Sequence, residues 1–161
     1  MTPAESLARR LHAADLYGDR PYADHLADVA RRLEEAGADV DTIAAGWLHD
    51  AVEHGHCTLT DILVQFGIQV AHAIRDVTDT VGTRGARFAA LLLRLPSMSR
   101  PGLHVKLADR ASNMAGGRKM YLAEWRALRP VIVPLVAGDP VGLLLLAQCD
   151  AAAEAMETRH G

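Results

Sequence analysis

Four polar residues of this 161-residue chain lie in or beside predicted apolar helices, where an unpaired charge is costly. His49 and Asp50 are adjacent at the end of the most apolar predicted helix, and Asp109 lies in a second, largely apolar helix. His25 lies beside the apolar face of another predicted helix. Moving a carboxylate out of water costs several kcal/mol, so Asp50 needs a compensating group such as a cation. Imidazole and carboxylate ligands without thiolates suit a divalent ion such as Mn, Fe, Co or Zn.

Two further polar residues have helical spacing from these candidates. Glu53 follows His49 by four residues and Asp50 by three, which places all three on one face of a helix. A carboxylate there could act as general base or proton shuttle for a metal-bound water. Asn113 follows Asp109 by four residues and could orient a substrate or hydrogen-bond a metal ligand.

Each residue alone also has a simpler interpretation. A His–Asp pair is common in proteins, and a single His25 would more often be a partly exposed helix residue. Asp109 could be the ion-pair partner of Lys106 or Arg110. The joint pattern over three helices is far more specific. The other histidines, at positions 12, 54, 56, 72, 104 and 160, are interpreted as surface or hydrogen-bonded groups, although those at 54 and 56 flank the predicted site.

The elements that would position these residues are predicted to be helices. Ala and Leu, with 28 and 21 residues, favour helix over sheet. Periodicity and Gly/Pro breaks predict helices over about 4–15, 23–36, 42–54, 58–66, 68–78, 84–95, 103–114, 119–128 and 141–157. Asp41 is the expected N-cap of the third helix, which is apolar on all sides and is expected at the centre of the domain. Residues 17–21 are predicted to form a loop.

The sequence shows no alternating strand pattern, repeat or linker, so we predict one all-α domain over residues 1–161 with seven to nine helices. The motifs occupy residues 5–125, and further helices occupy residues 126–161. Net charge of −3 excludes a broadly basic nucleic-acid surface. The apolar stretch 131–147 is interrupted by Pro134, Asp139 and Pro140, so no membrane span is expected. Two isolated cysteines and no secretory signal favour the cytoplasm.

Four segments carry a resemblance to a known family: residues 21–25 (PYADH), 42–53 (TIAAGWLHDAVE), 66–67 with 76–78 (FG, DVT), and 105–114 (VKLADRASNM). In order and spacing the chain resembles, over residues 5–125, the HD-domain metal-dependent phosphohydrolases. The resemblance is to the branch of the RelA/SpoT hydrolase domains and the small alarmone hydrolases.

The resemblance implies an HD-domain helical bundle with one Mn-type ion held by His25, His49, Asp50 and Asp109. It also implies that Glu53, with Asp50, takes part in water activation, and that Asn113 lies in the substrate pocket. The implied reaction removes the 3′-pyrophosphate of (p)ppGpp by attack of a metal-activated water. Candidate groups for the distal phosphates are Arg84, Arg87, Arg118, Lys119 and the hydroxyl of Tyr121, with Lys106 as a pocket-edge cation. For Arg84 and Arg87 a solvated helix face is an equal alternative.

The chain departs from the family pattern in two places. His54 stands where the family usually has an acid after the glutamate, and an imidazole there can still shuttle protons but lacks the negative charge. Residues 16–19 (LYGD) stand where a basic pair usually precedes the Pro-Tyr element.

Three functions therefore stay open: a stand-alone (p)ppGpp hydrolase, an HD hydrolase of another nucleotide or phosphate ester, and a degenerate domain that binds a nucleotide as a regulator. Four intact ligands argue against the third, and His54 argues weakly for it. The expected partner is a small-molecule nucleotide, with neither nucleic acid nor membrane, and a homodimer is the default oligomer.

Overall fold

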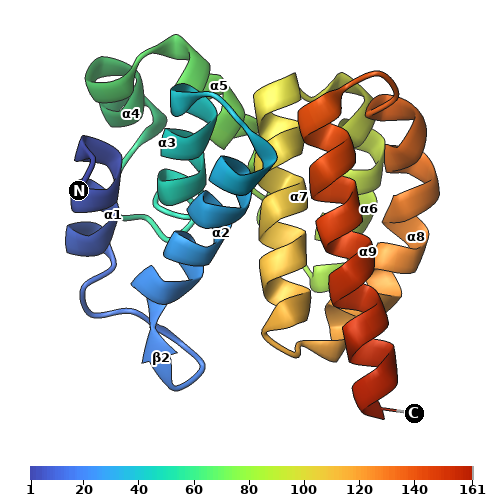
Figure 1. Ribbon diagram of the computed structural model, residues 1–161. Helices are drawn as coiled ribbons and strands as arrows, with labels where there is room; N and C mark the ends of the chain where they lie inside the picture. Colours follow the sequence, from blue (N-terminus) through green and yellow to red (C-terminus); the bar gives the residue numbers. More distant parts are fainter. Residues whose placement is uncertain (161) are drawn as a thin grey trace.

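The computed structural model describes residues 1–160, apart from the side chain of His160, and is helical except for one short hairpin (Figure 1). In chain order the elements are α1 (Pro3–Leu11), β1 (Leu16–Tyr17), β2 (Arg20–Pro21), α2 (Tyr22–Ala36), α3 (Val40–Leu48), α4 (Leu59–Phe66), α5 (Ile68–Val77), α6 (Arg84–Arg94), the 3-10 turn η1 (Leu95–Ser97), α7 (Arg100–Ala115), α8 (Lys119–Leu135) and α9 (Pro140–His160). These nine α-helices confirm the predicted all-α class.

Helix α7 lies at the centre of the described residues, between α1–α5 on one side and α6, α8 and α9 on the other (Figure 1). It packs against α2, α3, α5, α8 and α9, and eleven of its 16 residues are buried. The prediction that helix 42–54 would be central was wrong, because α3 packs against α1, α2 and α5 on one side of α7 (Figure 1). The more apolar helix is not the more central one here, since position depends on how many neighbours a helix acquires.

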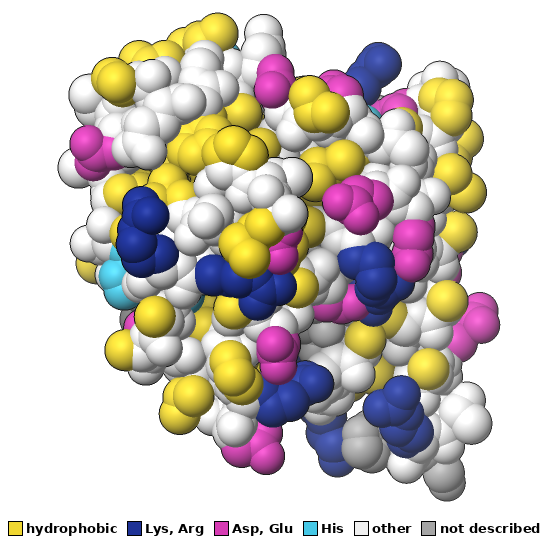
Figure 2. Space-filling model, turned by 60° about the vertical axis from the view of Figure 1, so that its left-hand side comes forward, with side chains coloured by type: hydrophobic (Ala, Val, Ile, Leu, Met, Phe, Trp, Pro, Cys, Tyr) yellow, Lys and Arg dark blue, Asp and Glu magenta, His cyan; other side chains and the backbone are white. Residues whose placement is uncertain are grey.

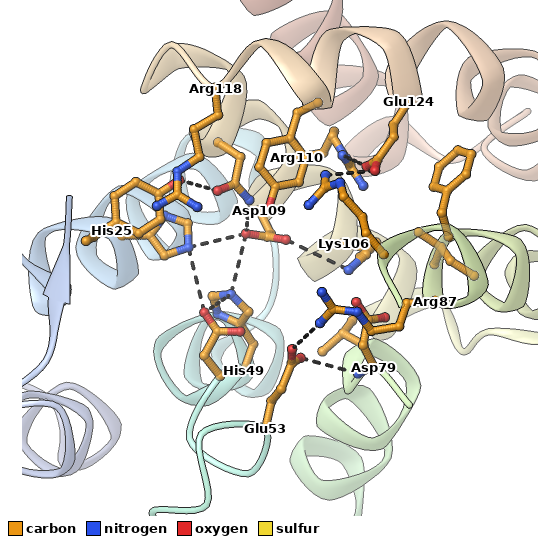
Figure 3. Close-up of a pocket in the computed structure, with 18 of the residues that line it drawn as sticks. His25, His49, Glu53, Asp79, Arg87, Lys106, Asp109, Arg110, Arg118 and Glu124 are labelled. Atoms are coloured by element: carbon orange, nitrogen blue, oxygen red, sulfur yellow. Dashed lines mark hydrogen bonds and ion pairs between the residues drawn. The ribbon is translucent and has the colours of Figure 1, made fainter. Parts of the chain in front are cut away.

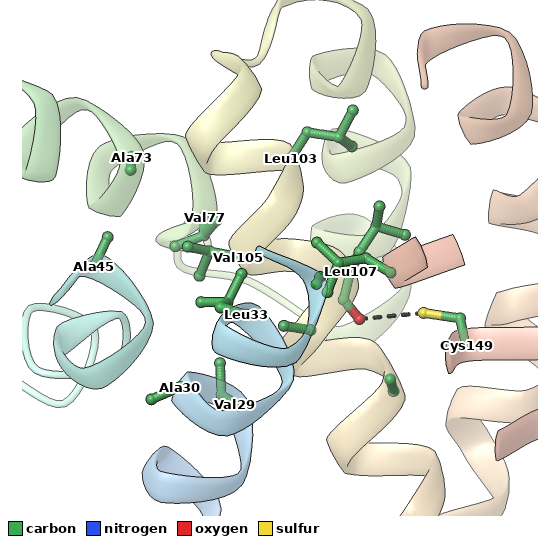
Figure 4. Close-up of a cluster of buried hydrophobic side chains, with 14 of the residues drawn as sticks. Val29, Ala30, Leu33, Ala45, Ala73, Val77, Leu103, Val105, Leu107 and Cys149 are labelled. Atoms are coloured by element: carbon green, nitrogen blue, oxygen red, sulfur yellow. Dashed lines mark hydrogen bonds between the residues drawn. The ribbon is translucent and has the colours of Figure 1, made fainter. Parts of the chain in front are cut away.

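The buried cluster joins the two halves of the molecule. Leu33 of α2 and Val105 of α7 both belong to it, and the Cys149 thiol of α9 donates a hydrogen bond to the Leu107 carbonyl at 3.1 Å (Figure 4). Alanine and leucine dominate this core, as the composition suggests. Close approach of helices through small side chains is what allows α7 to be covered on so many sides.

Several element boundaries differ from the prediction; for example, the first helix ends at Leu11 and not at residue 15. Helix α3 is capped by Asp39, whose Oδ1 accepts the Thr42 amide at 2.8 Å, and not by Asp41. It ends at Leu48, and the next residues form turns. Helix α8 continues to Leu135 past two prolines, which project outward, because its buried stripe of Trp125, Leu128 and Ile132 continues.

The segment predicted as a loop at residues 17–21 contains a two-stranded antiparallel hairpin, in which Leu16 pairs with Pro21 and Tyr17 with Arg20. Gly18 has a φ of 67° at the turn, a conformation that glycine adopts readily. Two residues per strand are too few for an alternating pattern, so the hairpin leaves no strand signal in the sequence. Among the described residues, no helix has both the length and the apolar character of a bilayer-spanning segment.

Gly46 sets how closely α3 approaches α2. A Cβ atom at this position would overlap Cδ1 of Leu33 and lie 3.6 Å from Cγ1 of Val29. We expect Gly46→Val to lower the free energy of unfolding by about 2 kcal/mol, because the core cannot absorb the added volume. Urea denaturation measures this change. Gly85 on exposed α6 has open space at its Cβ position, so Gly85→Val should change stability by no more than about 0.7 kcal/mol. Equal effects of the two substitutions would contradict the packing argument.

Candidate metal centre and active site

Three of the four predicted metal ligands converge from separate elements in the middle of the molecule (Figure 3). His25 comes from α2, His49 directly follows α3, and Asp109 comes from α7. Asp109 Oδ1 lies 3.3 Å from His25 Nε2 and 3.6 Å from His49 Nε2. One potential ligand atom from each of the three lies within 4.8 Å of the other two.

Asp50, the fourth predicted ligand, approaches the same imidazoles from another side. Its Oδ2 lies 3.1 Å from His49 Nε2 and 3.8 Å from His25 Nε2. The same oxygen accepts a hydrogen bond from the Tyr22 hydroxyl at 2.6 Å. Asp50 therefore contacts both imidazoles, with Tyr22 fixing its orientation, although it lies outside the compact group of His25, His49 and Asp109.

Neighbouring groups orient both imidazoles toward the two carboxylates. His49 Nδ1 donates to the Gly46 carbonyl at 2.8 Å, and because a carbonyl can only accept, this bond leaves Nε2 as the lone-pair nitrogen. His25 Nδ1 lies 3.1 Å from the Ser112 hydroxyl. His49 Nε2 is buried and has no hydrogen-bond partner among the described residues. Such an orphaned lone pair beside two carboxylates fits a divalent cation.

The charge state of the site also suits a cation. Burial acts to raise the pKa of Asp109, but the nearby imidazoles of His25 and His49 outweigh burial and hold the pKa well below its usual value. Burial likewise acts to raise the pKa of Asp50, and the adjacent His49 imidazole instead lowers it. Both groups are therefore carboxylates near neutral pH, the form in which they bind metals.

Glu53 lies beside this centre. It was predicted to share a helix face with His49 and Asp50, but it does not lie on a helix. It is in the turns after α3, where its Oε2 accepts the Asp79 amide at 3.3 Å and its Oε1 lies 3.6 Å from an Arg87 nitrogen. Burial, and next the Asp50 charge, raise the pKa of Glu53. A carboxylate with a raised pKa accepts a proton more readily, which suits a general base.

The centre opens into a pocket with a volume of about 140 Å³. Five cationic side chains line it: Arg84, Arg87, Lys106, Arg110 and Arg118. Five acidic side chains line it as well: Asp50, Glu53, Asp79, Asp109 and Glu124. The formal charges cancel, so a bound divalent cation would make the pocket net positive and suited to an anion.

Two arginine–tyrosine contacts shape the pocket walls. The guanidinium groups of Arg84 and Arg110 lie 4.7 and 4.5 Å from the ring centre of Tyr121. Both arginines also pair with Glu124, at 2.7 and 2.6 Å. Glu124 thereby holds both guanidinium groups in contact with the Tyr121 ring.

On the opposite wall, Arg118 lies 4.0 Å above the Tyr17 ring, which stacks on His25 at 4.6 Å. The Tyr17 hydroxyl hydrogen-bonds to Asn113 Oδ1. Asn113 Nδ2 in turn donates to Asp109 Oδ1 at 2.7 Å. The hairpin residue Tyr17 is thus joined to both a metal-ligand candidate and a pocket arginine.

Two of the predicted site residues, Lys119 and His54, lie away from the centre of the pocket. Lys119 is exposed and is not among the residues that line this pocket. His54 lies at the pocket edge, where its Nδ1 is 3.4 Å from Asp15 Oδ2. Lys106 lines the pocket, with its Nζ 3.9 Å from Asp109 Oδ2.

Several site residues are absent from the sequence prediction. Tyr22 and Ser112 lie inside the quoted motifs, but nothing in the motif spacing shows that they orient Asp50 and His25. Asp79 follows the DVT segment and could have been found only by knowing that the end of α5 faces Glu53. The further members of this group are Tyr17, Arg110 and Glu124.

The remaining histidines divide between paired and exposed positions. His104 Nε2 lies 2.6 Å from Asp139 Oδ2 in a buried pair near the start of α7, and His72 is exposed on α5. His160 lies outside the described side chains. On the face in Figure 2, Lys and Arg side chains are dispersed among acidic and apolar ones, in agreement with the expected lack of a broad basic surface.

These observations define a helical domain with a buried His/Asp cluster that could hold a metal ion and that opens into a pocket lined by cationic and acidic side chains. The profile of the HD domain matches residues 4–137, and the chain belongs to the HD domain family. The resemblance seen in the four motifs is therefore confirmed.

Curated relatives agree with this placement. The chain is 36% identical over 118 residues to a "Probable GTP pyrophosphokinase" of Mycobacterium leprae, covering 69% of this chain and 15% of that protein. It is 33% identical over 112 residues to the "Guanosine-3′,5′-bis(diphosphate) 3′-pyrophosphohydrolase MESH1" of Danio rerio, covering 68% and 62%. The chain thus spans less than two thirds of the length of these relatives.

A solved structure entitled "A metazoan ortholog of SpoT hydrolyzes ppGpp and plays a role in starvation responses" matches with a TM-score of 0.79. The match covers 94% of this chain and 92% of the other, at 20% identity, and shows a shared fold. A structure of lmo0812 from Listeria monocytogenes EGD-e matches with a TM-score of 0.53 at 32% identity, over 58% and 60% of the two chains.

Proposed function

We propose that this chain is a metal-dependent phosphohydrolase that removes the 3′-pyrophosphate from (p)ppGpp. The observation that carries the proposal is the convergence of His25, His49, Asp50 and Asp109 beside Glu53, in a pocket lined by five cationic side chains. The names of the similar pyrophosphohydrolases support the choice of substrate. Mn²⁺ is the proposed ion, because histidine and carboxylate ligands without thiolates suit it.

In this proposal the chain's own residues bind the substrate and move the proton. A bound divalent cation would lower the pKa of water and neutralise phosphate charge. Glu53, with its raised pKa, accepts the proton of the attacking water. The water oxygen bonds to the phosphorus attached to the ribose 3′-oxygen, and the bond between that phosphorus and the 3′-oxygen breaks. The 3′-oxygen takes up a proton, and the pyrophosphate that is released carries the oxygen of the water. Arg84, Arg87 and Arg118 face the pocket and neutralise the outgoing phosphates.

A second candidate is hydrolysis of another nucleotide. Tyr17 stands where the family usually has a basic pair, and in the fold its ring is held between Arg118 and His25. An aromatic ring presents a stacking surface and one hydroxyl where a lysine or arginine would present charge. The base and ribose selectivity of this pocket is therefore expected to differ from that of a basic site.

The two candidates are separated by measuring phosphate and pyrophosphate release with Mn²⁺ on ppGpp, GTP, deoxynucleoside triphosphates and monophosphates. Pyrophosphate release from ppGpp that is lost in His49→Ala supports the first. Release from another nucleotide with none from ppGpp supports the second. Tight metal binding without release from any nucleotide would favour a regulator that only binds.

Arg118 and its neighbour Lys119 provide a matched test of substrate binding. We expect Arg118→Gln to raise the KM for the nucleotide about 10-fold, because a charge-assisted hydrogen bond to phosphate is lost. Lys119→Gln should change KM less than about twofold, because its exposed side chain does not line the pocket. Steady-state kinetics of both variants checks the prediction. Equal changes in KM for the two variants would mean that Arg118 does not bind the nucleotide in this pocket.

A further inference from the structure

A second group of metal-ligating side chains lies outside the centre already described. This outer cluster consists of His12, Asp15, His54 and His56. His12 caps the end of α1, and Asp15 follows in the next turn. The two other histidines lie in the turns between α3 and α4. Segments about 40 residues apart in the sequence are therefore brought together here.

Three imidazole nitrogens meet one carboxylate oxygen in the outer cluster. Asp15 Oδ2 lies 2.7 Å from His12 Nδ1 and 2.6 Å from His56 Nε2. His54 Nδ1 lies 3.4 Å from the same oxygen. One potential ligand atom from each residue lies within 4.8 Å of all the others. A carboxylate oxygen has two lone pairs, so three ring nitrogens exceed what it can hydrogen-bond well.

The donor set and its spacing fit a four-coordinate ion. Three imidazoles and one carboxylate are ligands that Zn²⁺ accepts in a tetrahedral site. Each ligand atom in such a site lies about 2.0 Å from the ion, so the ligand atoms lie about 3.3 Å apart. The three ring nitrogens lie 2.6 to 3.4 Å from Asp15 Oδ2, and all four ligand atoms lie within 4.8 Å of one another, so they are already gathered on the scale of such a site.

The outer cluster is also exposed enough to solvent for a metal ion to enter. The His12 side chain is fully buried and closes the inner side. The side chains of Asp15, His54 and His56 are 26%, 32% and 28% exposed, so an ion can enter from solvent. The same feature makes substitution of His54 or His56 less disruptive to the core than substitution of His12.

Contacts through Tyr22 join the outer cluster to the first centre. The Tyr22 ring stacks on His12 at 5.0 Å and meets His54 edge-on at 4.8 Å. The Tyr22 hydroxyl donates to Asp50. An ion in the outer cluster would therefore tie the turns that carry Asp50 and Glu53 to the end of α1.

We propose that the outer cluster is a second metal site, which binds a zinc-type divalent cation and fastens the turns after α3 to α1. The site does not depend on the proposed hydrolase activity. It gives His54 a role as a ligand in place of the acid that the family usually carries at this position. His54 is then a positioning residue for the neighbouring centre.

Zinc counting on untagged, metal-free protein tests the proposal. After loading with Zn²⁺ and gel filtration, wild type should retain about two equivalents, and His49→Ala and His56→Gln about one each. The double variant should retain none. His72→Gln, which alters an exposed histidine of α5, should retain about two. Wild type that binds about one equivalent, or His56→Gln that binds as much as wild type, overturns the proposal.

A spectroscopic readout separates the outer cluster from the first centre. Co²⁺ added to His49→Ala should show the visible absorption of a four-coordinate site, and the double variant should lose it. Circular dichroism verifies that each variant is folded, and His54→Gln replaces His56→Gln if the latter does not fold. Identical Co²⁺ spectra for His49→Ala and the double variant would also overturn the proposal. Since neither readout measures turnover, failure of the hydrolase proposal leaves this test intact.

Discussion

Replacing His49 by alanine should remove metal from the central site and lower nucleotide hydrolysis by about 1,000-fold or more, equivalent to about 4 kcal/mol. His49 Nε2 faces both Asp50 and Asp109, at 3.1 and 3.6 Å. Its loss leaves two carboxylates with one imidazole, which weakens any cation they hold. Metal content, measured together with steady-state rates, checks the prediction.

The control for this substitution is His72→Ala, which removes an exposed imidazole on α5 and should leave both metal content and rate unchanged. Loss of the His49 side chain also removes its hydrogen bond to the Gly46 carbonyl, so circular dichroism must show that the variant is folded. A folded His49→Ala protein that hydrolyses nucleotides at the wild-type rate would refute the proposal that the central site holds the catalytic metal.

Replacing Glu53 by glutamine should lower kcat by about 100- to 10,000-fold while metal binding persists. The amide keeps the size of the side chain but cannot accept the proton of the attacking water. The wild-type rate should decrease as the pH falls below the pKa of Glu53, because only the carboxylate form accepts a proton. Burial, and next the Asp50 charge, raise this pKa. The variant should lack this acid limb. Rate measurements across pH, with KM recorded at each point, provide the test.

Glu34→Gln is the matched control, because Glu34 is exposed on α2 and lies outside the pocket. It should leave kcat within about twofold of wild type. Metal content distinguishes a lost base from a lost ligand, since Glu53→Gln should still bind the ion. A Glu53→Gln variant with normal kcat would assign the proton transfer to another group. His54→Asp would then show whether restoring an acid raises the rate.

The sequence by itself determined the helical class and singled out the four ligand candidates. Ala- and Leu-rich periodic segments allow few other folds, and glycine or proline ends most of them. His25, His49, Asp50 and Asp109 were recognisable because a polar residue in an apolar helix needs a partner. That argument depends only on local context, so it holds before the positions of the helices are known.

The tertiary structure decided what surrounds those ligands. Helix α7, and not α3, became the central helix, because burial depends on how many neighbours a helix acquires. Glu53 reached the pocket from turns and not along a helix face, through Asp79 and Arg87. Arg118 lines the pocket while adjacent Lys119 does not. The sequence could not distinguish the two, because side-chain direction at the start of a helix cannot be judged from sequence order.

The outer cluster shows most clearly which features come from the sequence and which from the tertiary structure. His12 and Asp15 belong to the end of α1, whereas His54 and His56 belong to turns about 40 residues later. Nothing in either segment alone signals a shared site. The two segments meet because α1 packs on α3 and Tyr22 fills the space between them. Sequence identifies the ligand types, and only the packing of the helices determines which of them meet, because contact depends on the path of the whole chain.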